Sequence, residues 1–262
     1  MCGRFVQVIN IRKIETIYGI TVSAGEELET SYNVAPGDYA YVISSSSPDE
    51  LLRYRFGLTP SWAKKPMYIF NARSEGDANK ENNPEFRGKK GIIMKPSFRK
   101  PIRSQRCIVV ANAFIEGPEK EKLDKPYVIA PKDKKYLSLA GIWDTWVDKD
   151  TGEEINSFAI ITTVANGITS KIGHPRSPVI IPHGREKKWL DSSMPLVEVL
   201  RYLKPYPGEF LEAFPVSVKI KNPNNKEREV LVPIGERLVT DNDDIVITRD
   251  LKLQGMGSRK RR

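Results

Sequence analysis

The 262-residue sequence contains only two cysteines and two histidines, and it has no long apolar run. Two cysteines, Cys2 and Cys107, cannot form a framework of several disulfides. The cysteines and histidines also lack the paired spacing of a zinc site, so we expect no metal. Because a membrane-spanning helix needs about 18 consecutive apolar residues, we expect no membrane span. The start of the chain lacks the basic-then-apolar layout of a signal peptide, which favours a cytoplasmic protein.

Acidic residues are in deficit. The chain has 33 Asp and Glu against 42 Lys and Arg, which gives a net charge of +9. Such a surplus favours a polyanionic partner, because basic side chains neutralise phosphates and release their counterions. Part of the surplus lies at Arg259–Arg262, within a segment 239–262 that we predict to be a basic tail. Residues 1–238 contain no repeat and no linker, so we predict that they form a single domain.

The predicted secondary structure is rich in strands. Asn10 can cap a short helix that ends at Gly19, and residues 195–202 have helical spacing. Alternating and β-branched runs predict strands at 39–43, 107–110, 127–130, 136–142, 157–163 and 230–233. Cys107 falls within one of these strands, so we expect a packed and unreactive thiol. This order of elements predicts an α+β fold with many antiparallel strands.

Position 2 carries the most specific chemical signal. The initiator methionine is normally removed before a small residue, and removal of Met1 gives Cys2 a free α-amine beside its thiol. At pH 7 a neutral α-amine is about 200-fold more populated than a neutral lysine amine. Such an amine attacks aldehydes to form an imine, and the adjacent thiol can then close a five-membered thiazolidine ring. Because that second step is intramolecular, proximity favours it.

Eight segments of the sequence match the motifs of one family in the correct order. They are Met1–Phe5, Tyr32–Pro36, Phe56–Ala63, Asn71–Glu75, Arg106–Glu116, Ala140–Trp143, Ser157–Asn166 and His174–Ile180. By these segments the chain resembles the SRAP family, the SOS response-associated peptidases. The resemblance implies a barrel-like, antiparallel core with peripheral helices. It also implies a cytoplasmic, nucleoid-associated and monomeric DNA-repair protein that crosslinks covalently to abasic sites in single-stranded DNA, without a cofactor.

The resemblance assigns four residues to the reacting centre. Cys2 is the nucleophile, and Asn71, Glu116 and His174 surround it. A glutamate can move protons at the Cys2 amine, and an asparagine can hydrogen-bond the Cys2 backbone or thiol. Histidine normally titrates near neutrality, so we expect His174 to protonate the sugar ring oxygen and to assist strand scission or crosslink reversal. His183 has no motif support, and we expect a structural role for it.

Five further residues are expected to contact DNA. Arg4, Arg73 and Arg176 can hold phosphates, and Pro36 and Trp62 can stack or wedge against bases. The chain departs from the family pattern at Gly117, where the family usually has tryptophan, so a base contact is lost or moved there. It also has extra residues between Asn71 and Glu116, which we expect to form an exposed loop at 79–91.

Three other functions remain open from the sequence. Amidotransferases with an N-terminal nucleophile also begin with Met-Cys-Gly, but they usually continue with isoleucine, whereas this chain has Arg4. The family name suggests a peptidase, and removal of Met1 by self-cleavage fits that name. A protein that binds single-stranded DNA without using Cys2 would form no covalent adduct, which separates it from the first interpretation.

Overall fold

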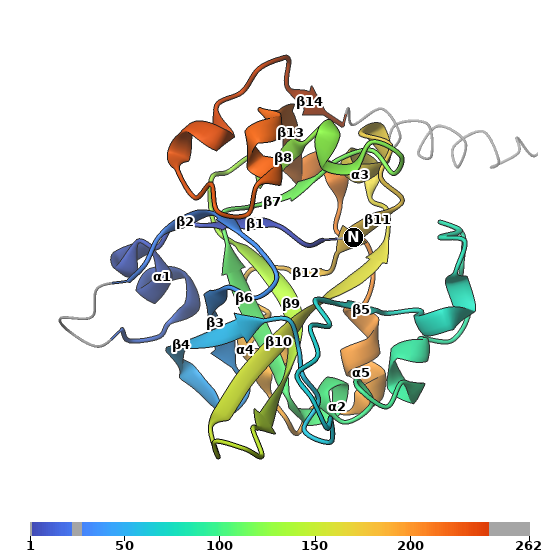
Figure 1. Cartoon of the computed structure of the whole chain (residues 1–262). Coiled ribbons are helices and arrows are strands. Elements are labelled where there is room, and N and C mark those ends of the chain that lie inside the picture. The colour runs from blue at the N-terminus through green and yellow to red at the C-terminus, as the bar shows by residue number, and fades with distance from the viewer. Residues whose placement is uncertain (1, 23–27, 241–262) are drawn as a thin grey trace, which may run out of the picture.

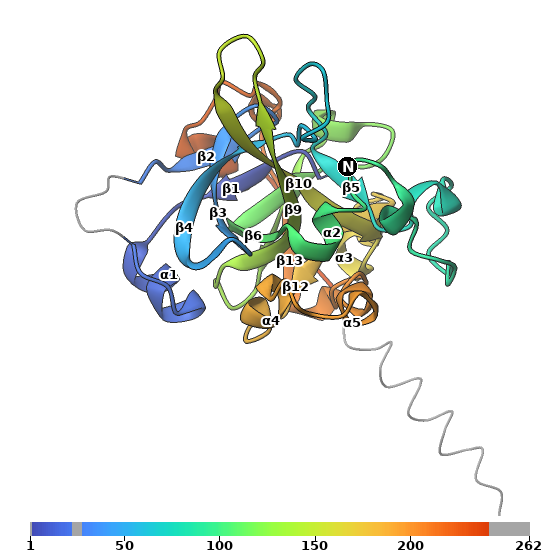
Figure 2. The same cartoon turned by 90° about the horizontal axis from the view of Figure 1, so that it is seen from below.

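Five strands close into a barrel at the centre of this computed structural model, which describes residues 2–22 and 28–240 (Figures 1 and 2). The strands are β3 (Tyr39–Ser44), β4 (Ser47–Phe56), β6 (Arg106–Ala111), β9 (Leu137–Val147) and β10 (Glu154–Val164). Four neighbouring pairs are antiparallel, and the parallel pair β10–β4 closes the ring. The predicted α+β fold with a barrel-like antiparallel core is therefore confirmed.

A second sheet lies beside one end of the barrel (Figure 1). Its strands, in spatial order, are β14 (Leu238–Val239), β13 (Leu211–Pro215), β8 (Tyr127–Pro131), β7 (Ala113–Glu116), β1 (Phe5–Gln7) and β2 (Ser31–Val34). The first strand of the chain thus pairs with β7, which directly follows barrel strand β6. Three short strands extend the barrel sheet: β5 (Asn71–Arg73), β11 (Arg176–Pro178) and β12 (Ile180–Ile181).

The helices are short and peripheral. They are α1 (Ile11–Tyr18), α2 (Pro101–Ser104), α3 (Gly167–Lys171), α4 (Glu186–Leu190) and α5 (Leu196–Arg201). As predicted, the Asn10 side chain accepts a hydrogen bond from the Lys13 backbone and Gly19 ends α1 in the left-handed conformation. Within the described residues, no helix has the length and apolar character to cross a membrane.

Two apolar clusters stabilise the barrel. One contains residues from all five barrel strands, including Val42, Phe56, Val109, Leu139 and Phe158. The other contains the opposite faces of β6 and β9, which are covered by side chains of α1, α4 and α5. Cys107 is fully buried in β6, which confirms the predicted packed position, and burial raises the pKa of its thiol, as expected for an unreactive cysteine.

The structure near the C-terminus differs from the sequence-based prediction at two places. The strand predicted at 230–233 is wrong, because Arg228–Leu231 forms a 3₁₀ turn and only Pro233 makes an isolated bridge, to Val216. The predicted tail was placed from residue 239, whereas Val239 still pairs with Glu212 in β13. Residues 241–262, with Arg259–Arg262, lie outside the described residues.

Candidate active site

The pairing of β1 with β7 brings the start of the chain to Glu116. Phe5 lies opposite Phe114 in an antiparallel register, and the Ile115 backbone donates a hydrogen bond to the Arg4 carbonyl. When this antiparallel register is continued by two residues, Gly3 lies opposite Glu116. Cys2 is only 1% exposed. Burial, together with the nearby Glu116 carboxylate, raises the pKa of its thiol well above the ordinary value, so the thiol keeps its proton at neutral pH.

Asn71 fixes the position of Cys2. Strand β5 pairs in parallel with β10, and Asn71 lies opposite Ile160 at the start of that pairing. The Asn71 Nδ2 atom donates a hydrogen bond of 2.8 Å to the Cys2 carbonyl. This contact confirms the predicted bond from Asn71 to the Cys2 backbone. The Asn71 Oδ1 atom is buried and has no hydrogen-bond partner among the described residues, so an acceptor remains beside Cys2.

Glu116 and His174 form a buried pair. The His174 Nε2 and Glu116 Oε2 atoms are 3.2 Å apart, and both side chains are buried. Burial raises the pKa of Glu116 to about 8. Burial also lowers the pKa of His174 to about 4. At neutral pH the pair therefore consists of a protonated carboxyl and a neutral imidazole. The expectation that His174 titrates near neutrality is wrong, because burial penalises its charged form.

Hydrogen bonds of the imidazole assign its tautomer. The His174 Nδ1 atom lies 2.8 Å from the Arg176 carbonyl and 3.3 Å from the Arg176 backbone nitrogen. The shorter contact favours an Nδ1–H that donates to the carbonyl. His174 Nε2 is then an acceptor, and the protonated Glu116 carboxyl is its donor. The pair therefore holds one proton between Glu116 and His174, next to Cys2.

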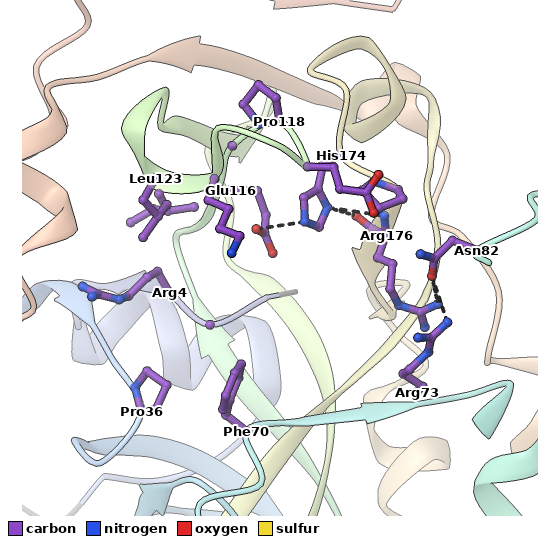
Figure 3. Close-up of a pocket in the computed structure, with 16 residues that line it drawn as sticks. Arg4, Pro36, Phe70, Arg73, Asn82, Glu116, Pro118, Leu123, His174 and Arg176 are labelled. Atoms are coloured by element: carbon purple, nitrogen blue, oxygen red, sulfur yellow. Dashed lines mark hydrogen bonds and ion pairs between the residues drawn. The ribbon is translucent and has the colours of Figure 1, made fainter. Parts of the chain in front are cut away.

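Glu116 and His174 line a cavity of about 530 Å³ (Figure 3). Gly3 also lines it, whereas Cys2 and Asn71 lie behind its wall and are not among the lining residues. Its lining is mixed, with apolar, acidic and basic side chains. The residues that line it include Arg4, Pro36, Phe70, Arg73, Asn82, Glu116, Pro118, Leu123, His174 and Arg176. Four of the five predicted DNA contacts thus lie on the cavity. Trp62 does not line it, although its side chain is 58% exposed in the loop that follows β4.

Arg176 is held by a buried ion pair. Its Nη2 atom lies 2.9 Å from Glu75 Oε2, and Thr162 Oγ1 accepts two further bonds from the same guanidinium. Burial alone would raise the pKa of Glu75, but the charge of Arg176 outweighs it and the pKa lies below the ordinary value. Sequence reasoning missed Glu75, even though it closes the Asn71–Glu75 motif. The signal that could have indicated Glu75 is its place in the same short motif as Arg73, a predicted DNA contact.

Asn82 joins the two cavity arginines, Arg73 and Arg176 (Figure 3). Its Oδ1 atom accepts a bond of 2.9 Å from Arg73 Nη2 and another of 3.0 Å from Arg176 Nη1. Arg73 also donates to the Asn79 carbonyl. The predicted exposed loop at 79–91 is mostly exposed, but one of its residues reaches into the cavity. No motif in the sequence indicated a role for Asn82.

Gly117 allows a close backbone approach at the cavity wall. A Cβ atom at this position would lie 1.6 Å from the Lys122 carbonyl oxygen, so no larger residue fits without moving that segment. The turn formed by Lys122–Asp124 therefore occupies the space that a side chain at residue 117 would take. Pro118 and Leu123 supply apolar surface to the cavity on this side.

Arg4 also lines the cavity, and hydrogen bonds anchor its guanidinium. Its Nη1 atom donates to Asn33 Oδ1 over 2.8 Å, and its Nη2 atom donates to the Lys221 carbonyl over 3.0 Å. Burial lowers the pKa of this guanidinium from its ordinary value, and arginine side chains remain protonated in proteins. Arg4 thus presents a fixed positive charge on the cavity.

Comparisons with known proteins point to a single family. The family model of the SOS response associated peptidases (SRAP) matches residues 1–223. The abasic site processing protein YoqW of Bacillus subtilis is 32% identical over 238 residues, which cover 88% of this chain and 99% of YoqW. The chicken abasic site processing protein HMCES is 29% identical, over 78% of this chain and 66% of its own length. A crystal structure of a Bacteroides thetaiotaomicron protein superimposes with a TM-score of 0.74 at 31% identity, covering 89% of this chain and all of its own.

Proposed function

Because the chain belongs to the family of SOS response associated peptidases, we propose that it processes abasic sites in single-stranded DNA by covalent capture at Cys2. The observation that carries this proposal is that a pair of cavity residues, Glu116 and His174, lies beside the chain segment that contains Cys2, with Gly3 on the cavity wall. Asn71 holds the Cys2 backbone, and the Glu116–His174 pair lies next to Cys2. Arginines line the same cavity and supply the charge that a DNA backbone requires.

Capture begins with the amine that Cys2 gains when Met1 is removed. Its nitrogen attacks the aldehyde carbon of the ring-opened deoxyribose and forms a carbinolamine. The buried Asn71 Oδ1 atom can accept a hydrogen bond from this amine, which orients the lone pair toward the aldehyde. An internal cysteine cannot perform this step, because its nitrogen belongs to a peptide bond.

Glu116 then supplies and recovers one proton. Its protonated carboxyl donates to the carbinolamine hydroxyl, which leaves as water and gives an iminium ion. The resulting carboxylate takes the proton of the Cys2 thiol, and the sulfur adds to the iminium carbon to close the thiazolidine. His174 Nε2, at 3.2 Å, accepts a hydrogen bond from the carboxyl and holds it in place. The cycle restores Glu116 and requires no metal or organic cofactor.

Mass spectrometry of the intact protein tests this function. After mixing with an oligonucleotide that carries one abasic site, we expect a species whose mass equals protein without Met1 plus DNA minus one water. An undamaged oligonucleotide of the same sequence should give no such species. If DNA binds but the denatured protein keeps its free mass, the chain is a non-covalent binder. Hydrolysis of free glutamine would instead indicate an amidotransferase.

Asn82 is expected to compete with DNA phosphate for Arg73 and Arg176. Its Oδ1 atom occupies the position between the two guanidiniums at which a phosphate oxygen would bind. Because Asn82 has a positive φ of 57°, glycine fits there without strain, and N82G removes only the side chain. We expect N82G to bind undamaged single-stranded DNA several-fold more tightly, by about 1 kcal/mol.

The substitution N82D tests the same contact in the opposite direction. A carboxylate between the two guanidiniums pairs with both and repels phosphate, so binding should weaken and lose part of its salt dependence. Fluorescence anisotropy with a labelled oligonucleotide measures both affinities. Weaker binding by N82G would show instead that Asn82 holds the arginines in the geometry that DNA requires.

A further inference from the structure

The outer face of β3 and β4 carries basic and aromatic side chains in alternation. Tyr39 lies directly opposite Arg55 in the antiparallel register, and Arg53 is two residues before Arg55 on the same face. The Arg53 guanidinium carbon is 5.5 Å from the centre of the Tyr39 ring. The Arg55 guanidinium carbon is 4.5 Å from the centre of the Tyr68 ring. The four side chains therefore form a row in the order Arg53, Tyr39, Arg55, Tyr68.

The two tyrosines in this row are exposed. Tyr39 is 47% exposed and Tyr68 is 51% exposed, so each ring presents a face or an edge to solvent. Arg53 makes a surface ion pair of 2.6 Å with Glu29, and Arg55 hydrogen-bonds the Tyr68 hydroxyl. Exposed ion pairs are weak, so a phosphate can take the place of Glu29 at Arg53. A hollow of about 360 Å³, lined in part by Tyr39, Arg53 and Lys226, adjoins the row.

The row continues from the rim of the candidate active site. Pro36 and Phe70 both line the large cavity (Figure 3). Phe56 connects them, because its carbonyl accepts a bond from the Gly37 backbone and its ring lies 6.3 Å from the Phe70 ring. Tyr39 follows Pro36 by three residues, and Tyr68 precedes Phe70 by two. A strand of DNA that leaves the cavity over this rim meets Arg55 and both tyrosines.

We propose that the row Arg53–Tyr39–Arg55–Tyr68 binds the undamaged single-stranded DNA that flanks the abasic site. The proposal rests on the function proposed above, since it extends the same DNA path. Unpaired bases offer π-faces that stack on exposed aromatic rings, and arginines between the rings contact the backbone phosphates. Paired bases in a duplex do not offer their faces, so the row favours a single strand. Stacking does not depend on base identity, so we expect little sequence preference.

A length series tests the proposal. The oligonucleotides carry a reduced, unreactive abasic site and about one to nine flanking nucleotides on either the 5′ or the 3′ side, so the series runs from below to within the site sizes of single-strand binders. Affinity should increase with length on one side only. In the double variant Y39A/Y68A that increase should be lost, with binding of the longest oligonucleotide weakened at least about fivefold. Y39F/Y68F should bind like the unsubstituted protein, because stacking does not need the hydroxyls.

The arginines are tested by salt dependence. R53A/R55A should lower the slope of log affinity against log salt by about 0.7 for each phosphate contact removed, whereas Y39A/Y68A should leave it unchanged. F210A/R201A is the matched control, because Phe210 is an exposed aromatic residue and Arg201 forms an exposed ion pair with Glu198, both away from the row. Thermal unfolding verifies that each variant is folded.

The outcomes separate this proposal from the function itself. If Y39A/Y68A binds every length like the unsubstituted protein, the row is not part of the DNA path. If the binding affinity does not increase with the length of the single-stranded flank, the row does not bind single-stranded DNA. If a double-stranded flank gives the same affinity as a single-stranded flank of equal length, stacking of unpaired bases on the tyrosines is excluded. Covalent capture of a very short abasic oligonucleotide, which cannot reach the row, reports on Cys2 alone and should be equal in all variants.

Discussion

Replacing Cys2 by alanine is expected to abolish the heat-stable conjugate with abasic DNA, with a loss of at least about 100-fold, because ring closure depends on an intramolecular thiol. Alanine is also small, so Met1 is still removed and the α-amine is retained. The amine of C2A can therefore form an imine, which reverses on heating. Borohydride reduces an imine to a stable amine, so we expect C2A to give a conjugate only when the reductant is present.

Two controls make this result specific. C107A removes the other thiol, which is buried in β6, and should leave the yield of conjugate unchanged. A variant with one extra residue between Met1 and Cys2 keeps the thiol but converts the Cys2 nitrogen into a peptide bond. It should give no heat-stable conjugate without borohydride, because its free amine and its thiol no longer belong to one residue and cannot close the thiazolidine ring together. Conjugate from C2A at the full level without a reductant would overturn the role of the thiol.

Local signals in the sequence predicted the elements better than their arrangement. The Asn10 cap and Gly19 fixed both ends of α1, because each acts on the backbone next to it. The alternation at 157–163 found β10, which pairs with β4, β5, β9 and β11. No local pattern specifies that β10 pairs in parallel with β4, so closure of the barrel came only from the resemblance. The apolar run at 230–233 misled, since a 3₁₀ turn buries Val230 equally well.

In the candidate site, too, local features were predictable from the sequence and long-range contacts were not. Cys2 was predictable because its chemistry depends only on its place in the chain. The approach of Glu116 to Cys2 depends on the register of β1 against β7, which brings together residues more than a hundred positions apart. The protonation states depended on burial that the sequence does not report, so the titration of His174 was predicted in the wrong range. Asn82 reaches the cavity through an irregular loop, for which no periodicity exists.

Replacing Glu116 by glutamine is expected to slow formation of the conjugate by about 10²- to 10⁴-fold at neutral pH. Glutamine has nearly the same shape and keeps a hydrogen bond toward His174, but it cannot release or take a proton. Binding of an undamaged oligonucleotide should be unchanged, since the carboxyl of Glu116 is already neutral below pH 8. E119Q is the matched control, because Glu119 lines the same cavity at an exposed position. Its rate should equal that of the unsubstituted protein.

The dependence of the rate on pH distinguishes proton transfer by Glu116 from a structural role. As pH rises, the Cys2 α-amine, with an ordinary pKa near 8, loses its proton and becomes nucleophilic, so the rate first increases. Above a pKa of about 8, Glu116 no longer holds the proton needed to expel water, so the rate then decreases. The unsubstituted protein should give a bell-shaped profile with its maximum near pH 8. His174, with a pKa of about 4, adds no change in this range.

In E116Q the decreasing limb has no group to cause it, so the rate should rise to a plateau and the defect should shrink above pH 8. A bell of the same shape and position in E116Q would assign the acid to another residue.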